Sequence, residues 1–296
     1  MATISEDQLA GWSGPSSGTE QEKQTHTEKM IREAITAHGA FQGASYSVYA
    51  KGSYANNTNV RSDSDVDIAI ECSEVSYFDD KDPDEDHSGT PYRGIWTPEY
   101  LRSEVEAALR AKFSGAVDST GSTALRVNSN TARVDADVVP CFSFVEYFAG
   151  GVTREGTRVF KKSGGSTENY SKLQLRNGTN MNKRTNTYYK KAVRILKRLE
   201  NSMVAAGVTD ELPSYLMECL VYNCPDEYFA RTTWRDVMQG CLANIFNNTF
   251  GPEPTVESER WLEVNEAKYL FFTSQKWTRE QVHTFAGAAW TYMGLE

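Results

Sequence analysis

The chain has no apolar run that approaches the roughly 18–20 residues needed to cross a bilayer, so we expect no membrane-spanning helix and no membrane partner. Its first 24 residues have neither a basic start nor an apolar stretch, and we therefore expect no secretory signal. Cysteine is scarce, and the five that occur are an odd number, which does not suit a disulfide framework. Free thiols, a reducing compartment and a cytoplasmic protein are the expectation.

Zinc ligands are also lacking. Cys219 and Cys224 are the only cysteines close together in the sequence, and none of the four histidines lies near them at the spacing of a zinc site. Both fall in a helical pattern, which favours core thiols over a metal site.

An excess of positive charge is missing as well, because the formal net charge is −9. Such a chain is a poor candidate for coating a long nucleic acid, so nucleic-acid binding is not expected. The charges are unevenly distributed: residues 63–86 hold eleven Asp or Glu and one Lys, whereas residues 154–198 hold thirteen Lys or Arg and two Glu. This pattern suits small anionic ligands that carry divalent metal, although two solvated charged faces would also produce it.

Hydrophobic periodicity predicts a sheet-bearing part followed by a helical part. We expect a flexible N-terminal tail over residues 1–20, a sheet-bearing lobe over 21–184 that begins with a long helix, and a helical lobe over 185–296. Strands are expected at 45–51, 66–71, 124–129, 133–144 and 156–162. Residues 77–95 indicate a long exposed loop. Helices are expected at 25–38, from Pro98 to about Phe113, and at 186–203, 212–223, 226–247, 256–272 and 278–293.

The stretch KGSYANNTNVRSDSDVDIAIE, residues 51–71, carries the most chemistry. Side chains at alternate strand positions share a face, so Asp65 and Asp67 project together, about 7 Å apart along the strand. Two such carboxylates make half of a Mg²⁺ site. A later strand, RVDADVVPCF, carries Asp135 and Asp137, and an acid in an apolar strand is costly unless it is paired or metal-bound. Asp63 is interpreted as a structural residue of the preceding loop.

Gly52 and Ser53 lie where the strand at 45–51 gives way to a turn. Glycine lets a phosphate approach the backbone, and exposed N–H groups and the serine hydroxyl can bind its oxygens. Gly-Ser, then Asp-x-Asp about ten residues later, then a distant acidic strand describes two-metal phosphoryl transfer.

Together these residues resemble the DNA-polymerase-β-like nucleotidyltransferases and, more narrowly, the bacterial CD-NTases, relatives of cyclic GMP–AMP synthase and oligoadenylate synthase. The resemblance rests on KGSYANNTNVRSDSDVDI and on the Val-Val-Pro that follows the third acid. It implies an α+β fold with a nucleotidyltransferase lobe on a mixed, twisted sheet, a C-terminal helical lobe, and a central cleft that holds the nucleotides. The helix at 25–38 would be the family's spine helix.

The resemblance also implies roles for single residues. Gly52 and Ser53 would position the donor triphosphate. Asp65 and Asp67 would bind two Mg²⁺ ions, for which Mn²⁺ is a substitute. The family's third acid directly precedes Val-Val-Pro, which selects Asp137 over Asp135 as the third metal ligand and catalytic residue.

Two helical segments, NTYYKKAVRILKRL and LPSYLMECL, resemble family helices that bind nucleotide. Lys197 would contact the triphosphate, and Lys190 is a second basic candidate. Ser214 would touch phosphate and Tyr215 would stack on a base. Three of these positions have a plainer alternative. These are an exposed helix lysine in an i,i+3 or i,i+4 pair for Lys197, a helix-start residue for Ser214, and a core position for Tyr215.

The residues by themselves predict metal-dependent nucleotidyl transfer, and the resemblance implies a cyclic di- or oligonucleotide synthase in bacterial antiphage signalling. It would join NTPs (ATP, GTP or a pyrimidine NTP) with Mg²⁺ and release pyrophosphate, as a monomer whose cyclic product acts on a separate effector. Two alternatives stay open: a nucleotidyltransferase with an RNA, drug or protein acceptor, and a nucleotide-binding protein without turnover.

Overall fold

The computed structural model describes residues 4–60 and 65–295. The chain divides into two compact units. The first, which we call the helical unit, comprises Met1–Ser16, Asn56–Val60 and Leu173–Glu296. The second, the sheet unit, comprises Ser17–Ala55 and Arg61–Lys172. Over the described residues, no helix combines the length and the apolar character that crossing a membrane requires.

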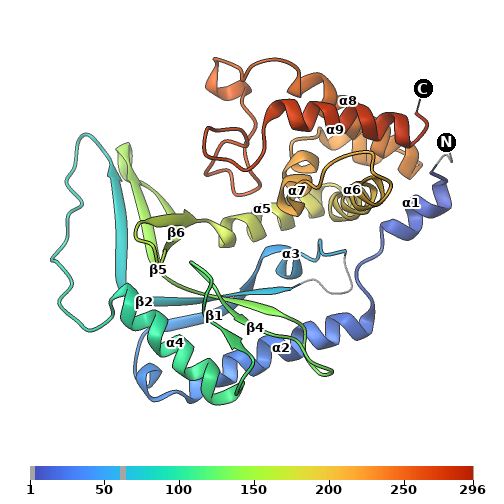
Figure 1. Cartoon of the computed structure of the whole chain (residues 1–296). Helices are drawn as coiled ribbons and strands as arrows, with labels where there is room; N and C mark the ends of the chain where they lie inside the picture. The colour runs from blue at the N-terminus through green and yellow to red at the C-terminus, as the bar shows by residue number, and fades with distance from the viewer. Residues whose placement is uncertain (1–3, 61–64, 296) are drawn as a thin grey trace. The chain divides into compact units, whose positions relative to one another are not determined.

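The sheet unit is built on one mixed sheet (Figure 1). Its strands are β1 (Tyr46–Lys51), β2 (Val66–Lys81), β3 (Val117–Asp118), β4 (Leu125–Val127), β5 (Ala136–Phe148), β6 (Val152–Phe160) and β7 (Ser166–Asn169). They are ordered β1-β2-β5-β4-β3, and β6 pairs with both β5 and β7. The central strands β2 and β5 run parallel, whereas the other pairs are antiparallel.

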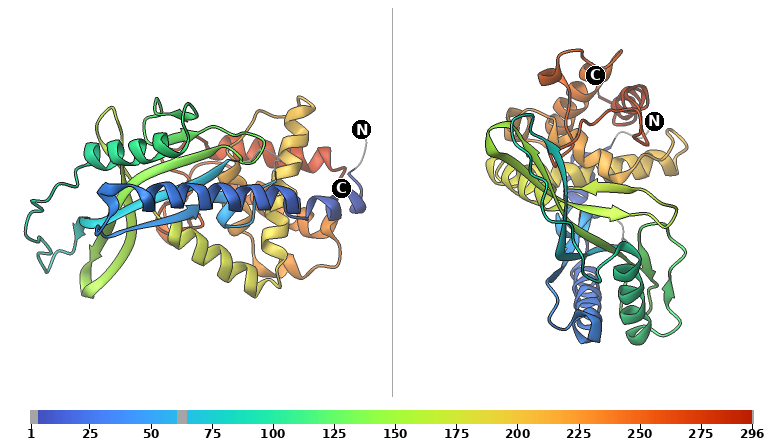
Figure 2. Two further views of the ribbon diagram at one scale, coloured as in Figure 1. Left: turned by 90° about the horizontal axis from the view of Figure 1, so that it is seen from below. Right: turned by 90° about the vertical axis from the view of Figure 1, so that its left-hand side faces the viewer.

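One face of this sheet packs against two helices, α2 (Gly18–Ala37) and α4 (Pro98–Lys112). Figure 2 shows them side by side on the same side of the sheet. Alternation along the strands turns Ile68 and Ile70 of β2 toward these helices, into a core with Ile31 and Leu101. The opposite face therefore carries the intervening positions, which include Asp67 of β2 and its partner Asp137 of β5.

The helical unit contains the other long helices and a core of its own. Leu196, Leu216, Leu242 and Phe285, each from a different helix, are among its fully buried side chains. Its helices are α1 (Glu6–Trp12), α6 (Tyr188–Ala205), α7 (Ser214–Tyr222), α8 (Trp234–Thr249), α9 (Arg279–Tyr292) and most of α5 (Ser171–Arg184), with 3₁₀ turns η3 (Asp226–Ala230) and η4 (Glu257–Glu259). Three further short elements belong to the sheet unit: the helix α3 (Gly52–Ala55) and the 3₁₀ turns η1 (Gly39–Phe41) and η2 (Ala149–Gly151).

The expected flexible tail is wrong for the part of 1–20 that the structure describes. Residues 6–12 form α1, which begins after the N-cap residue Ser5. Leu9 of this helix is fully buried in the core of the helical unit. One buried leucine anchors a segment whose composition alone suggested disorder.

Three further expectations differ from the structure. The prediction of a helix at 256–272 is wrong, because this segment holds only η4 and an isolated bridge between Leu262 and Tyr269. Its apolar residues are interrupted by buried Glu263 and Asn265, which form hydrogen bonds instead of facing solvent. The exposed loop begins later than residue 77, since β2 continues to Lys81. The units divide near residue 172 rather than 184.

The cysteines behave as core residues. All five are free and buried, including Cys219 and Cys224, as the sequence indicated.

Candidate active site

Four charged residues lie in register across four neighbouring strands of the sheet unit. Lys51 of β1 pairs with Asp67 of β2, and Asp67 pairs with Asp137 of β5. Asp137 in turn pairs with Arg126 of β4. Directly opposed residues on neighbouring strands point to the same face of a sheet. These four residues, which we call the charged row, therefore place two acids side by side between two cations.

Ion pairs link the charged row to two further acids. Arg126 donates from Nη1 to Asp65 Oδ2 at 3.0 Å and from Nη2 to Asp135 Oδ2 at 2.8 Å. The same Nη1 lies 3.8 Å from Asp137 Oδ1. On the other side of the row, Lys51 Nζ lies 3.6 Å from Asp67 Oδ1. The structure thus brings Asp65, Asp67 and Asp137 to one place on one face of the sheet.

Electrostatics in the site favour a bound cation. Burial raises the pKa of Asp137, and the charges of Asp65 and Asp67 raise it further, against the effect of Arg126. Burial also raises the pKa of Asp65, which Arg126 opposes. Asp135 differs, because the Ser129 N–H and Arg126 outweigh its burial and hold its pKa below the ordinary value. Negative charge at Asp65 and Asp137 is therefore incompletely compensated by the protein.

Gly52 begins α3 and lies against the acidic pair. Its φ is +68°, a left-handed conformation that side chains other than glycine rarely adopt. A Cβ at this position would lie 2.4 Å from Asp67 Oδ2. The turn therefore requires glycine both for its backbone conformation and for the space that the Asp67 carboxylate occupies. Ser53 follows in α3. The predicted structural residue Asp63 lies outside the described residues.

The remaining predicted nucleotide-binding residues lie in the helical unit. Lys197 is 2% exposed, so the alternative of an exposed helix lysine is wrong. Its Nζ lies 4.0 Å from Glu218 Oε2 and donates to Thr58 Oγ1 at 3.4 Å. Glu218 also accepts hydrogen bonds from Asn56 and Gln174. Lys197 is therefore part of a buried polar network, and its contact with triphosphate stays a prediction.

Lys190, Ser214 and Tyr215 are more accessible. Burial lowers the pKa of the half-buried Lys190. Ser214 is the first residue of α7. The Tyr215 hydroxyl donates to Glu263 Oε2 at 3.2 Å, while its ring packs against the core of the helical unit. Nucleotide binding by these three residues also stays a prediction.

Sequence reasoning missed Lys51 and Arg126 as members of the site. Arg126 stands between the buried Leu125 and Val127, so a single charge in a short apolar strand was the available signal. Recognising it requires the register of β4 against β5, which the sequence does not state.

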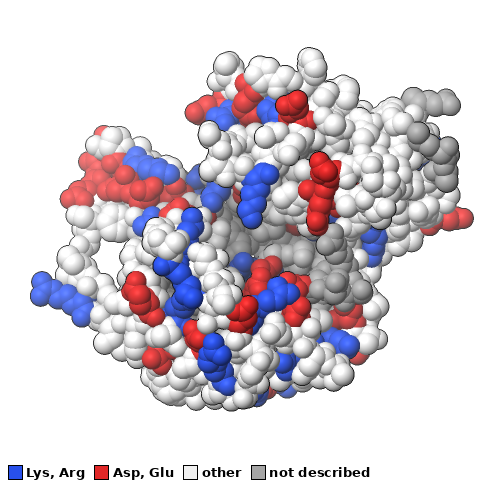
Figure 3. Space-filling view, in the orientation of Figure 1, with Lys and Arg blue, Asp and Glu red and all other residues white. Residues whose placement is uncertain are grey.

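A second acidic cluster lies at the opposite end of β2 and in the loop after it, and Figure 3 shows acidic side chains gathered there, at the upper left. Ligand atoms of Asp82, Glu85 and His87 lie within 4.8 Å of one another. Asp80 accepts the His87 N–H at 3.0 Å, and similar short-range bonds form along the loop. These contacts explain the cluster as a loop held by its own turns, as its sequence suggested.

Known proteins resemble this chain over nearly all of its length. Residues 176–294 match the family model of the cGAS/DncV-like nucleotidyltransferase C-terminal helical domain. A cyclic dipyrimidine nucleotide synthase CdnE of Legionella pneumophila is 37% identical over 289 residues, which are 95% of either chain. A protein of the same description from Cecembia lonarensis is 34% identical and covers 99% of both chains.

Solved structures also resemble this chain over nearly all of its length. The Elizabethkingia meningoseptica CdnE cyclic dinucleotide synthase, solved with GTP and Apcpp, superposes with a TM-score of 0.80 at 28% identity over 99% of this chain and 100% of that one. The Rhodothermus marinus CdnE c-UMP-AMP synthase, solved with Apcpp and Upnpp, gives 0.83 at 26% identity over 99% and 98%.

The mixed sheet, its acidic pair and these matches define a nucleotidyltransferase of the α+β class. Within that class, the chain belongs to the CD-NTases, the cGAS/DncV-like nucleotidyltransferases. The predicted family, fold class and enzyme class are confirmed.

Proposed function

We propose that this protein is a cyclic dinucleotide synthase that accepts pyrimidine nucleoside triphosphates. The charged row carries the proposal of catalysis, because it sets two carboxylates side by side, with a third acid beside them, next to a glycine turn. The pyrimidine preference is supported by two relatives that match almost end to end and are described as cyclic dipyrimidine nucleotide synthases. A relative described as a cyclic dipurine nucleotide synthase is 30% identical, so base choice varies within the family.

The acidic residues fit divalent metal. Asp65, Asp67 and Asp137 offer hard carboxylate oxygens, each on a side chain that is about one-third exposed. Burial and mutual repulsion raise the pKa of Asp65 and Asp137, which is the imbalance that a cation would relieve. We assign two Mg²⁺ ions to these three residues. Bound Mg²⁺ would supply Lewis-acid chemistry, acidifying the attacking ribose hydroxyl and neutralising charge at the α-phosphate.

The chain's own residues would orient the reactants. Gly52 and Ser53 would hold the donor triphosphate through backbone N–H groups and the serine hydroxyl, beside Asp67. Asp137, whose pKa is raised, would accept the proton of the attacking ribose hydroxyl. The new bond joins that oxygen to the α-phosphorus, the bond to the bridging oxygen breaks, and pyrophosphate leaves. A second round of the same step closes the ring.

Lys190, Lys197, Ser214 and Tyr215 complete the proposal as nucleotide-binding residues of the helical unit. Antiphage signalling, action of the cyclic product on a separate effector, a monomeric state and a cytoplasmic location belong to the same proposal. The likeness to the family supports the first two, and the scarcity of cysteine supports the cytoplasmic location.

Mass spectrometry of the small-molecule product tests the function. The protein incubated with Mg²⁺ and all four NTPs should form a phosphatase-resistant cyclic dinucleotide that contains at least one pyrimidine, with release of pyrophosphate. Asp67→Asn should abolish both, whereas Asp210→Asn, an exposed acid of the helical unit, should not. A product that forms only when RNA is added would favour the alternative acceptor and contradict the proposal.

A further inference from the structure

The acids assigned to Mg²⁺ already contact a cation of the protein. The Arg126 guanidinium pairs with Asp65 and Asp135 at hydrogen-bond distance and lies 3.8 Å from Asp137. It therefore contacts two of the three proposed metal ligands. Lys51 stands in the same relation to the third, Asp67.

We propose that Arg126 is the internal counter-ion of this site, a positioning residue that partly compensates the charge of Asp65 and Asp137 before metal binds and yields both carboxylates to the metal. The proposal rests on the metal assignment made above. It makes Arg126 and Mg²⁺ competitors for the same carboxylates, so that Arg126 sets how tightly the protein binds metal in the absence of nucleotide.

The contacts of Arg126 differ in strength, and this difference indicates which carboxylate it keeps and which it releases when metal takes its place. Its 2.8 Å bond to Asp135 is the shortest, and the Ser129 N–H donates to the same carboxylate and holds it in place. The 3.8 Å separation from Asp137 is an ion pair beyond hydrogen-bond distance. Asp135 therefore anchors the guanidinium, while Asp137 is the contact that is most easily given up.

Exposure allows the exchange to occur without unfolding. The Arg126 side chain is 40% exposed, so its guanidinium can turn toward water while one Nη keeps its bond to Asp135. A fork of five N–H donors suits this task, because it can hold two carboxylates at once and release one. This gives Asp135, the acid that the metal assignment leaves out, a separate role as the anchor.

Mn²⁺ binding without nucleotide tests the competition, measured by electron paramagnetic resonance of the free ion. Arg126→Gln should bind Mn²⁺ about tenfold more tightly than the parent, because one competing positive charge is gone. The difference in Mn²⁺ affinity between Arg126→Gln and the parent should narrow at high ionic strength. The Mn²⁺ affinity of Arg126→Lys should lie between those of the parent and Arg126→Gln, since a single ammonium cannot bridge two carboxylates as a guanidinium does. The control is Arg32→Gln, which removes the same charge from an exposed i,i+4 pair on α2.

The outcomes separate this inference from the metal assignment. Unchanged or weaker Mn²⁺ binding in Arg126→Gln, with binding abolished in Asp67→Asn, would overturn the counter-ion role and leave the metal site standing. Unchanged binding in Asp67→Asn would overturn the metal site itself.

Nitrogen-15 spectra of the arginine side chains in the parent protein give an answer that does not depend on how the glutamine variant folds. The guanidinium signal that is missing from Arg126→Lys should shift when Mg²⁺ is added. A signal that stays in place would also contradict the exchange.

Discussion

Gly52 combines a conformational requirement with a steric one, and the two can be separated by mutation. Gly52→Ala places a methyl group 2.4 Å from Asp67 Oδ2, so the carboxylate must move. We expect kcat to fall about a hundredfold, because displacing a catalytic group by an ångström costs about that much. Initial rates of pyrophosphate release at saturating NTP measure the effect.

Gly43→Ala is the matched control for this substitution. Gly43 has a similar φ of +79°, but a Cβ there meets nothing within 4 Å. Both variants should lose about 1 kcal/mol of stability from the left-handed backbone, and only Gly52→Ala should lose turnover. Equal losses of activity in the two variants would show that the close approach to Asp67 has no catalytic importance.

The acids and the glycine turn could be predicted because their signals are local. Asp65 and Asp67 are two residues apart, the first directly before β2 and the second inside it, and Gly52-Ser53 marks the turn before them. Arg126 could not be assigned in this way, because its place beside Asp137 depends on strand register. The burial of Lys197 against Glu218 depends on how α6 packs against α7, so the sequence of neither helix predicts it.

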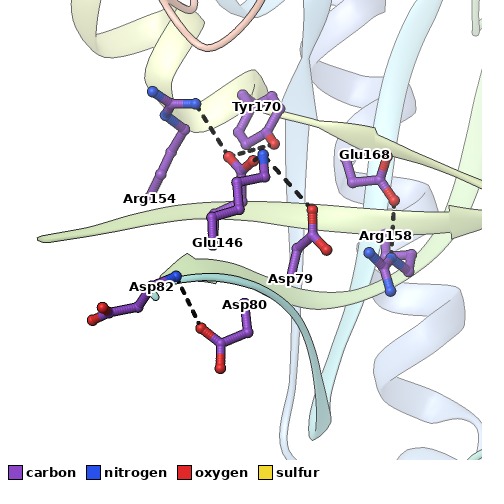
Figure 4. Close-up of polar contacts among 9 residues, drawn as sticks. Asp79, Asp80, Asp82, Glu146, Arg154, Arg158, Glu168 and Tyr170 are labelled. Atoms are coloured by element: carbon purple, nitrogen blue, oxygen red, sulfur yellow. Dashed lines mark hydrogen bonds and ion pairs between the residues drawn. The ribbon is translucent and has the colours of Figure 1, made fainter. Parts of the chain in front are cut away.

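At the scale of elements, one buried carboxylate joins three strands of the sheet unit at their ends away from the charged row (Figure 4). It links β2, β5 and β6 to Tyr170, the residue before α5. Glu146 of β5 is 4% exposed and accepts a hydrogen bond from the Tyr170 hydroxyl at 2.7 Å. It also pairs with Lys81 of β2 and, at 3.2 Å, with Arg154 of β6. Although burial alone would raise the pKa of Glu146, the bonds from Lys81 and Tyr170 hold it below the ordinary value.

Glu146→Gln should therefore destabilise the protein in a pH-dependent way. At neutral pH we expect a loss of about 1–2 kcal/mol, since the amide keeps a partner for Tyr170 but loses its charge. A carboxyl with a lowered pKa in the folded protein contributes stability above its unfolded pKa of about 4.3. That contribution disappears as the pH falls through the folded pKa, so parent and variant should converge in acid.

Urea unfolding of parent and variant from pH 7 down to pH 3 measures this difference. Glu155→Gln, on an exposed position of β6, is the control and should change stability little at any pH. A difference between parent and Glu146→Gln that is constant with pH would show that the carboxylate charge is not what stabilises these strand ends.

Elements with strong periodicity were predicted well, and elements held by buried polar groups were not. The Thr97-Pro98 helix start and the inward residues of α4, such as Leu101 and Val105, follow from local rules. Residues 256–272 also show apolar spacing, but their backbone is fixed by hydrogen bonds of Glu263 and Asn265. Periodicity carries no information about such partners.

At the scale of the whole molecule, the helical unit is assembled from three separate stretches of the chain. Arg194 of α6 donates to the carbonyl oxygens of Ser13 and Asn57, at 2.8 and 2.6 Å. Glu218 accepts from Asn56 and Thr58. The sequence suggested a simple division at residue 184, because contacts between distant stretches leave no periodic trace.

A fragment of residues 173–296 should consequently fail to fold by itself, although over the described residues it contains α6, α7, α8 and α9 complete and most of α5. It lacks the acceptors for Arg194 and two donors for Glu218, and a buried charge without partners costs several kcal/mol. Circular dichroism should show no cooperative thermal transition for this fragment. The matched control is the full chain cleaved once at an inserted protease site between Lys172 and Leu173, which retains every stretch and should stay associated and melt cooperatively. If the isolated fragment instead melted as sharply as the cleaved chain, the stretches around Ser13 and Asn57 would be peripheral to the unit rather than part of its core.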